Sequence, residues 1–288
     1  MEHVGFIGLG NMGGRICGAI AKKEYPLTVY DIRDCAMEPF KGRATLAKDA
    51  AQVIEESDIV MMSLPSTKEV EPTVEVFLQH NIQGKIIVDL STSYPISTRK
   101  LFEKVKEKGG QFCDIPVSGL PSDADEAKLL ALFGGEECTY EALKPLVACF
   151  ASRFANLGAT GNGHIAKLIF NFIGLSYVNI YALAFPLTQK LGLDNMQLLE
   201  LLKGTGMDCG TFRFYTPKMV AQTYDMAFAL ELAHKDLTYV KNLFEEYQVP
   251  AFALDGTLAM LRTGIRDGNG KKDYSACMQT MLDFFADK

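Results

Sequence analysis

Hydrophobic positions follow different patterns in the two halves of this chain. In the first half, short apolar runs recur and are separated by segments with helical spacing. The runs are expected strands, at residues 4–7, 27–30, 59–64, 86–90, 112–117, 129–133 and 153–156. Strands that alternate with helices predict an α/β domain, with a mostly parallel sheet and helices on both faces.

The pattern changes after Gly163. The apolar positions then keep helical spacing, in segments 164–191, 195–203, 231–247, 251–265 and 275–286. No run typical of a strand follows, so the second half is predicted to be all-helical. The change falls at a glycine-rich joint, and a chain of 288 residues favours two domains. We therefore predict domains at 1–162 and 163–288, joined by a long helix from about His164.

A glycine turn follows the first strand. Gly8, Gly10 and Gly13 form G-x-G-x-x-G between an apolar run and a helical pattern. In a Rossmann-type domain the first glycine permits the tight turn, the second lets backbone approach a pyrophosphate, and the third lets the helix pack closely. The predicted cofactor-binding loop comprises Gly8, Leu9, Gly10, Asn11, Met12 and Gly13.

The second strand ends at Asp31, about 20 residues past the glycines. An acid there is placed to accept hydrogen bonds from the adenosine ribose and to repel a 2′-phosphate, so NAD is favoured over NADP. Arg33 favours the opposite preference, because a nearby guanidinium can hold that phosphate. The alternative is that Asp31 simply starts a turn.

Composition is that of an ordinary globular protein, with 48% apolar and 22% charged residues. A net charge of −6 argues against a nucleic-acid partner. The seven cysteines contain no C-x-x-C pair, and they and the four histidines show no metal-ligand spacing. With a strand already at Val4, we expect no signal peptide, no metal and a cytoplasmic protein with reduced thiols. Residues 168–187 are apolar enough to consider as a membrane span, but a helix buried between domains or subunits is favoured.

Ligands bind outside the carboxyl ends of the strands in open α/β sheets. Leu64 and Pro65 end one expected strand, and Ser91 and Thr92 follow another. The two hydroxyls are candidates to face a nicotinamide or ribose, or alternatively to cap the next helix.

A third strand end carries Ser118, Gly119 and Leu120. The Ser118 hydroxyl and the backbone N–H groups of the next two residues are candidates for a small anion cradle that suits a carboxylate. The alternative is a purely structural Ser–Gly turn.

Lys167 and Asn171 open the first helix of the second half and, being i and i+4, share one helix face. A lysine in an apolar helix is expected to be partly desolvated, which lowers a lysine pKa and favours acid/base work. The alternative is a surface lysine with a packed stem. Lys235 and Asp236 lie in a later helix, either reaching a cofactor or forming an exposed pair.

Together these motifs resemble the β-hydroxyacid dehydrogenase family, which includes 3-hydroxyisobutyrate dehydrogenase, tartronate semialdehyde reductase and related semialdehyde reductases. The resemblance covers nearly the whole chain, with four motifs in order: 8–13, 114–119, 161–171 and 235–237. It implies that Lys167 is the catalytic acid/base, that Asn171 orients the substrate, and that Ser118 and Gly119 bind its carboxylate. It further implies that the cofactor is contacted by Leu64, Pro65, Thr92 and Lys235.

The substrate motif departs from the family pattern. Leu120 stands where the family has a second glycine, and Pro121 and three acids (Asp123, Asp125 and Glu126) follow where the family has small residues. We expect the backbone cradle to survive and the Leu120 side chain to reshape the pocket.

The resulting expectation is an oxidoreductase that transfers a hydride between NAD, or less favoured NADP, and a small 3-hydroxy acid or semialdehyde. Two alternatives share the scaffold: an imine reductase and a non-catalytic NAD(P)-binding protein. Lys167 argues against both, because such relatives usually replace the lysine. The apolar helical half further predicts a homodimer or homotetramer.

Overall fold

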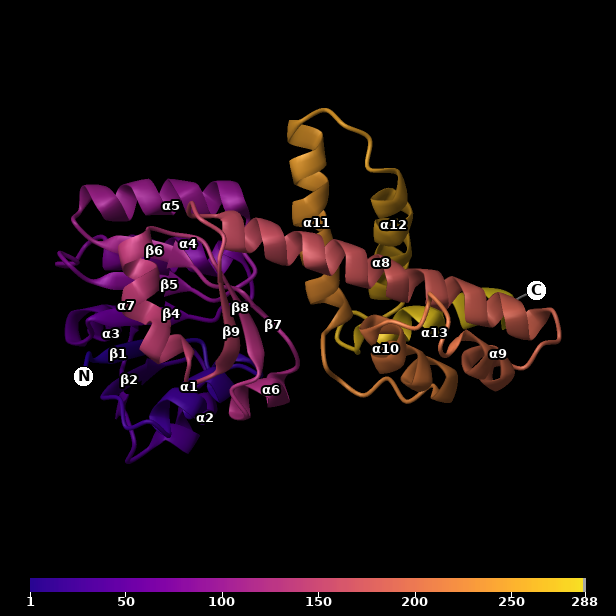
Figure 1. Cartoon of the computed structure of the whole chain (residues 1–288), viewed down its shortest axis with the longest axis horizontal. Coiled ribbons are helices and arrows are strands. Elements are labelled where there is room, and N and C mark those ends of the chain that lie inside the picture. Colours follow the sequence, from indigo (N-terminus) through magenta and orange to yellow (C-terminus); the bar gives the residue numbers. More distant parts are fainter. Residues whose placement is uncertain (287–288) are drawn as a thin grey trace. The chain divides into compact units, whose positions relative to one another are not determined.

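The computed structural model of the protein describes residues 1–286. Contacts divide the chain into unit 1, Met1–Lys167, and unit 2, Leu168–Lys288. The predicted boundary at 162/163 lies slightly before this division and stays a prediction of where the two domains separate. Each unit has its own hydrophobic core. Figure 1 shows strands and helices in unit 1 and helices in unit 2.

Unit 1 is built on a six-stranded sheet in the order β3-β2-β1-β4-β5-β6. All neighbouring strands pair in parallel, which confirms the α/β prediction. The strands are β1 (Val4–Ile7), β2 (Leu27–Tyr30), β3 (Thr45–Leu46), β4 (Ile59–Met62), β5 (Ile86–Asp89) and β6 (Gln111–Asp114). Only β3 was not expected, because it has two exposed residues and no apolar run.

Helices cover both faces of this sheet. Successive side chains of a strand point to opposite faces, and apolar side chains on both faces need to be buried. On β4, Met61 packs into one core cluster with Ile16 of α1, whereas Val60 packs into another with Val74 of α4. The helices of unit 1 are α1 (Gly13–Ala21), α2 (Asp34–Met37), α3 (Ala50–Glu56), α4 (Thr67–Phe77), α5 (Pro95–Glu107), α6 (Pro121–Asp125) and α7 (Glu137–Val147), with a 3-10 turn η1 (Glu38–Phe40).

A second, three-stranded sheet contains β7 (Val117–Ser118), β8 (Leu129–Phe133) and β9 (Ala151–Asn156). The expected single strand at 112–117 was therefore wrong, since it is divided between β6 and β7. Pro116 lies at the break, and proline has no N–H to donate to a strand ladder. The chain leaves the parallel sheet here and pairs antiparallel with β8.

Unit 2 is helical throughout its described residues, as the spacing predicts. Helix α8 (Asn162–Lys190) begins in unit 1 and continues into unit 2. It is followed by α9 (Asn195–Leu202), α10 (Gly210–Ala221), α11 (Leu230–Glu246), α12 (Phe252–Arg266), a 3-10 turn η2 (Tyr274–Ala276) and α13 (Cys277–Ala286). Helix α10 was not among the predicted segments, and it contains Pro217.

The core of unit 2 contains one buried acid that organises several turns. The Asp273 carboxylate accepts hydrogen bonds from the N–H groups of Ala227 (2.8 Å) and Phe228 (3.1 Å) and pairs with Lys218 (3.2 Å). Burial alone would raise the pKa of Asp273, but its hydrogen bonds outweigh burial and lower that pKa. Asp273 therefore stays ionised and joins the turns before α11 and η2.

Helix α8 is long and apolar enough to span a membrane by length and composition, with a mean hydropathy of 1.7 over its most apolar window. Its buried positions form a stripe with Leu175, Val178 and Phe185, which pack in the core of unit 2. These contacts place one face of α8 in the core of unit 2, whereas its burial between domains or subunits stays a prediction.

Candidate active site

The glycine turn between β1 and α1, residues 8–13, is here called the phosphate loop. Gly8 has φ of +91°, and a Cβ there would lie 2.3 Å from the carbonyl oxygen of Ser63. A Cβ on Gly13 would lie 2.1 Å from the carbonyl oxygen of Gly8. Gly10 is different, because a Cβ there would meet nothing within 4 Å. The open face of Gly10 leaves room for a ligand to approach the backbone.

The amides of the phosphate loop suit an anion. Among residues 1–286, no acceptor is found for the N–H groups of Gly10, Asn11 and Met12. They stand at the start of α1, whose first turn contains no acidic residue. Unpaired amides and the positive end of a helix dipole together bind phosphate groups. The loop therefore fits the pyrophosphate of a dinucleotide.

Asp31, directly after β2, is buried and tied to this loop. Its carboxylate accepts hydrogen bonds from the Leu9 N–H (2.7 Å), the Arg33 N–H (2.9 Å) and the Arg33 side chain (3.2 Å). Burial acts to raise the pKa of Asp31, but these hydrogen bonds and the Arg33 charge outweigh it and lower that pKa. The carboxylate is thus ionised, and the alternative that Asp31 only starts a turn does not explain its bond to Leu9.

Two more predicted cofactor segments meet at the carboxyl edge of the sheet. The Leu64 N–H after β4 donates to Ser91 Oγ after β5 (2.9 Å), and the Ser91 N–H donates to Asp89 (2.9 Å). Pro65 and Thr92 directly follow these two residues. The alternative that Ser91 and Thr92 cap the next helix was wrong, because the N-cap of α5 is Tyr94.

A buried cluster at the same edge fixes the start of α8. The Asp114 carboxylate, at the end of β6, accepts the N–H groups of Gly161 (2.6 Å) and His164 (2.7 Å). The His164 ring contacts the Thr98 hydroxyl (2.8 Å) and the Ser91 carbonyl oxygen (3.1 Å). Burial raises the pKa of Asp114 despite the opposing effects of His164 and the two N–H donors.

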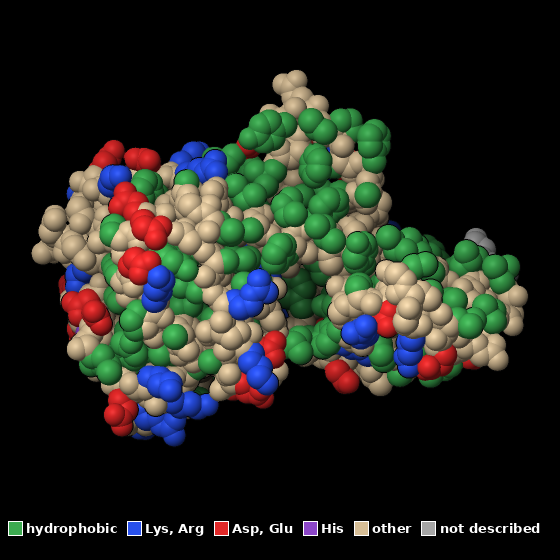
Figure 2. All heavy atoms as spheres, in the orientation of Figure 1, with side chains coloured by type: hydrophobic (Ala, Val, Ile, Leu, Met, Phe, Trp, Pro, Cys, Tyr) green, Lys and Arg blue, Asp and Glu red, His purple; other side chains and the backbone are tan. Residues whose placement is uncertain are grey.

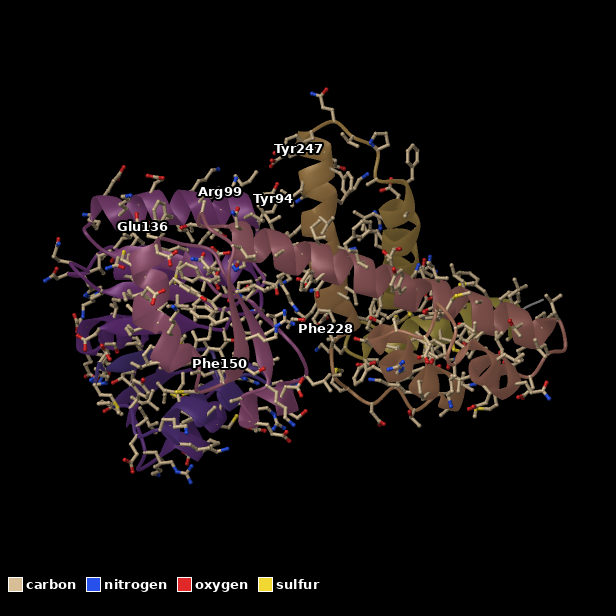
Figure 3. All side chains as sticks on the ribbon, viewed as in Figure 1. Tyr94, Arg99, Glu136, Phe150, Phe228 and Tyr247 are labelled. Atoms are coloured by element: carbon tan, nitrogen blue, oxygen red, sulfur yellow. The ribbon has the colours of Figure 1, made fainter. Side chains whose placement is uncertain are left out.

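Arg99 on α5, labelled in Figure 3, also helps to hold the start of α8. Its side chain donates to the Thr160 carbonyl oxygen (3.3 Å). Lys167 lies on α8 three residues after His164 and is half-buried. The sequence did not single out His164, since one histidine in a helical segment gives no spacing signal.

In unit 2 the structure brings Asn171 and Lys235 together through a residue that was not chosen as a site residue. Asn171 Nδ2 donates to Asp236 Oδ2 (2.6 Å), and Lys235 Nζ pairs with Asp236 Oδ1 (2.9 Å). Asp236 is buried on the apolar face of α11, so the alternative of an exposed pair was wrong for it. The sequence did offer a signal for Asp236, because this acid falls within the apolar stripe formed by Ala233, Leu237 and Val240.

The loop of Ser118, Gly119 and Leu120, here called the serine loop, departs from the expected cradle. The Leu120 N–H donates to Asp123 Oδ2 at 2.6 Å, so one expected anion donor already has an acceptor. Gly119 has φ of +138°, and a Cβ there would lie 2.9 Å from the same Asp123 oxygen.

Among residues 1–286 no group of three or more His, Cys, Asp or Glu is arranged to hold a metal ion. Four of the seven cysteines are buried thiols, namely Cys17, Cys113, Cys149 and Cys277. Burial raises the pKa of each of these thiols.

Residues 3–158 match the family described as the NAD binding domain of 6-phosphogluconate dehydrogenase. Residues 161–281 match the family described as the NAD-binding domain of NADP-dependent 3-hydroxyisobutyrate dehydrogenase.

Similar proteins cover almost the full chain. The mitochondrial 3-hydroxyisobutyrate dehydrogenase of Mus musculus is 31% identical, over 97% of this chain and 87% of the relative. The 2-hydroxy-3-oxopropionate reductase of Escherichia coli (strain K12) is 29% identical, over 96% of both. A solved structure of 3-hydroxyisobutyrate dehydrogenase from Mycobacterium tuberculosis, with L-serine, shares the fold with a TM-score of 0.89 at 23% identity, over 98% of this chain and 99% of that one.

The fold, the phosphate loop and these matches define an NAD(P)-dependent dehydrogenase with a Rossmann-type domain followed by a helical domain. More particularly, the chain belongs to the β-hydroxyacid dehydrogenase family, as its motifs suggest.

Proposed function

We propose that this protein transfers a hydride between NAD and a small 3-hydroxy acid of the 3-hydroxyisobutyrate type, or the corresponding semialdehyde, with Lys167 as general acid/base. The observation that carries the proposal is the anchoring of α8. Asp114 binds the first turn of α8 to the carboxyl edge of the sheet, the edge at which the phosphate loop begins. Lys167 follows one turn later in the same unit.

Lys167 moves the proton in this proposal. A bound nicotinamide cofactor accepts or supplies the hydride. In oxidation, Lys167 Nζ takes the proton of the substrate hydroxyl. In reduction, the ammonium returns that proton and stabilises the charge that develops on the carbonyl oxygen. Proton transfer by a positioned side chain contributes roughly 10²–10⁴-fold to a rate.

NAD is proposed as the preferred cofactor. Asp31 is ionised and keeps lone pairs for a ribose hydroxyl, because a carboxylate offers about four acceptor positions. Arg33 would favour NADP if its guanidinium were available, but this side chain already pairs with Asp31. The other proposed cofactor contacts are Leu64, Pro65, Thr92 and Lys235.

On the substrate side, Ser118 and Gly119 are proposed to bind the carboxylate, with Leu120 at the edge of the pocket. Asn171 is proposed to orient the substrate. The hydrogen bond from Asn171 to buried Asp236 supports this role, because it holds the amide in one orientation.

The test follows the absorbance of reduced nicotinamide with NAD and NADP separately. The substrates are 3-hydroxyisobutyrate, 3-hydroxypropionate, glycerate, 4-hydroxybutyrate and their aldehyde partners. Lys167→Ala should lose most turnover, roughly 10²–10⁴-fold, while the Kd of NAD changes little. Lys190→Ala, a lysine at the exposed end of the same helix, is the matched control. Equal loss of turnover and NAD binding in Lys167→Ala would indicate misfolding and remove the support for its role.

An imine reductase or a non-catalytic NAD(P)-binding protein remains the alternative for a chain with this scaffold. Lysine-dependent turnover of a hydroxy acid separates the proposed enzyme from both. Silence across the panel with NAD still bound would favour them.

We also propose that the protein forms a homodimer or homotetramer. In unit 2, α8 exposes apolar side chains at successive steps of four, three and seven residues: Ile173 (48% exposed), Tyr177 (45%), Ile180 (58%) and Leu187 (48%). Hydrophobic side chains also gather over α11 and α12 in Figure 2. Such a stripe is typical of a helix that packs against another chain. Light scattering should give a multiple of 31.7 kDa, and Ile180→Asp should lower it; a wild-type mass of one chain would contradict the proposal.

A further inference from the structure

We propose that Asp123 is a specificity-determining residue that competes, within the protein, with the carboxylate of the substrate. The proposal rests on the proposed function, because it concerns the serine loop that would bind that carboxylate. It predicts that the affinity for an anionic substrate is set by the cost of displacing Asp123.

The Asp123 side chain lies next to the backbone of the serine loop. Asp123 Oδ2 lies 2.6 Å from the Leu120 nitrogen and would lie 2.9 Å from a Cβ on Gly119. One carboxylate oxygen therefore occupies the Leu120 N–H and lies close to the backbone of Gly119, the two positions that the sequence assigned to the cradle. A substrate carboxylate at the same place would meet an acceptor in place of a donor.

The charge of Asp123 differs from that of its neighbours in having no ion-pair partner among the described residues. The neighbouring acids are paired, since Asp125 contacts Arg15 of α1 and Glu126 contacts Lys128. Within the described part of the chain, no ion pair involves Asp123. Lys128 interacts with Asp123 electrostatically but forms its ion pair with Glu126. With no cation in direct contact among the described residues, the Asp123 carboxylate repels an incoming anion. Two carboxylates that share one site disfavour each other's charged forms.

The hydrogen bond between Asp123 and Leu120 is local to the start of α6. Asp123 occupies the third position of α6, and its N–H donates to the Leu120 carbonyl oxygen (2.9 Å). The arrangement is half of a capping box, in which a side chain reaches back to the N-cap N–H. Because this bond is local, rotation of one side chain breaks it and returns the Leu120 N–H to a ligand. Asp123 can therefore be displaced without unfolding α6.

A simple helix cap and an internal competitor predict different results. A cap predicts that removal of Asp123 lowers the Tm and leaves substrate discrimination unchanged. A competitor predicts that removal of Asp123 selectively strengthens the binding of anions. The discriminating quantity is the ratio of KM values for a carboxylate and for its uncharged amide.

The experiment compares Asp123→Asn and Asp123→Ala with wild type, using 3-hydroxypropionate and 3-hydroxypropionamide. Asn keeps the acceptor for the Leu120 N–H and removes the charge, whereas Ala removes both. We expect the KM for the acid to fall about tenfold in Ala and less in Asn, since like charges in a binding site weaken affinity by at least this factor. The KM for the amide and the kcat for both substrates should stay within about twofold.

Glu126→Gln is the matched control, because it removes one negative charge beside α6 without touching the serine loop. An equal fall in KM for the acid in this variant would assign the effect to general charge and overturn the proposal. A parallel change for acid and amide in the Asp123 variants would also overturn it.

Calorimetric titration with propionate, an unreactive carboxylate, makes the proposal independent of turnover. The NAD-saturated Asp123→Ala protein should bind propionate about tenfold more tightly than wild type. If no substrate shows Lys167-dependent turnover, the proposed function fails, but this titration still decides whether Asp123 excludes carboxylates. Unchanged propionate affinity would overturn the role of Asp123 whatever the turnover.

Discussion

The phosphate loop and the serine loop use the same backbone chemistry with opposite results. Both place N–H groups at the start of a helix in unit 1. In the phosphate loop, the N–H groups of Gly10, Asn11 and Met12 have no acceptor among residues 1–286, and the first turn of α1 lacks an acid. In the serine loop, Asp123 in the first turn of α6 already accepts the Leu120 N–H. One carboxylate at the third helical position thus decides whether such a turn is open to an anion.

The largest expected effect comes from closing the open loop. Gly10→Ala should raise the Kd of NAD about 100-fold, because it blocks hydrogen bonds from backbone to charged phosphate that contribute about 3 kcal/mol together. The fold should be unaffected, since a Cβ there meets nothing within 4 Å. Calorimetric titration with NAD measures the change. Gly18→Ala, which also has open space on α1, is the control. An unchanged Kd would mean that the cofactor does not approach Gly10.

A smaller effect should follow from giving α1 the acid that α6 has. Arg15 occupies the third position of α1, so Arg15→Asp imitates Asp123. We expect the Kd of NAD to rise about tenfold, because a charge at a helix N-terminus changes anion binding by about 0.5–1 kcal/mol per unit charge. Arg15→Gln separates the loss of the Asp125 ion pair from the new charge. Equal effects of Asp and Gln would remove the argument that the acid itself closes the loop.

The smallest expected effect concerns the far side of the phosphate loop. Asp31→Asn should lower the preference for NAD over NADP about fivefold, because Asn keeps one acceptor oxygen and the change removes about 1 kcal/mol, the size of one ordinary net hydrogen bond. Steady-state kinetics with each cofactor measure the ratio. A preference that stays the same would assign cofactor choice to another residue.

Asp31 also has a pH signature. Its pKa is lowered in the folded protein, so its carboxylate stabilises the fold above the ordinary aspartate pKa of about 3.9. That stability is lost as the pH falls through the lowered pKa. Thermal unfolding at a series of acidic pH values should show a steeper loss in wild type than in Asp31→Asn. Identical slopes would contradict the lowered pKa.

Some features followed directly from the sequence because they depend on local spacing. The strand, glycine turn and helix at residues 4–21 were confirmed, as were the α/β character of the first half and the helical second half. Strand limits were less accurate where proline changes pairing, as at Pro116 between β6 and β7. The three acids after Leu120 (Asp123, Asp125 and Glu126) were visible in the sequence. That Asp123 binds the serine loop was not predicted, although the general capping pattern offered that signal.

Long-range contacts could be found only in the folded chain. Asp114 holds the start of α8 through residues about 50 positions away, and Asp236 joins Asn171 to Lys235 across 65 positions. Neither pairing has a periodic signal, because the partners belong to separate elements whose distance depends on the whole fold.

The sequence by itself determined the phosphate loop, the α/β first half followed by a helical second half, and the family, since short-range backbone preferences and glycine positions encode them. Tertiary structure alone decided which polar groups form hydrogen bonds within the protein and which stay available to a ligand. Folding buried Asp31 against Leu9, Asp114 against Gly161 and Asp236 against Asn171, because a buried carboxylate must find hydrogen-bond donors wherever the packed chain supplies them.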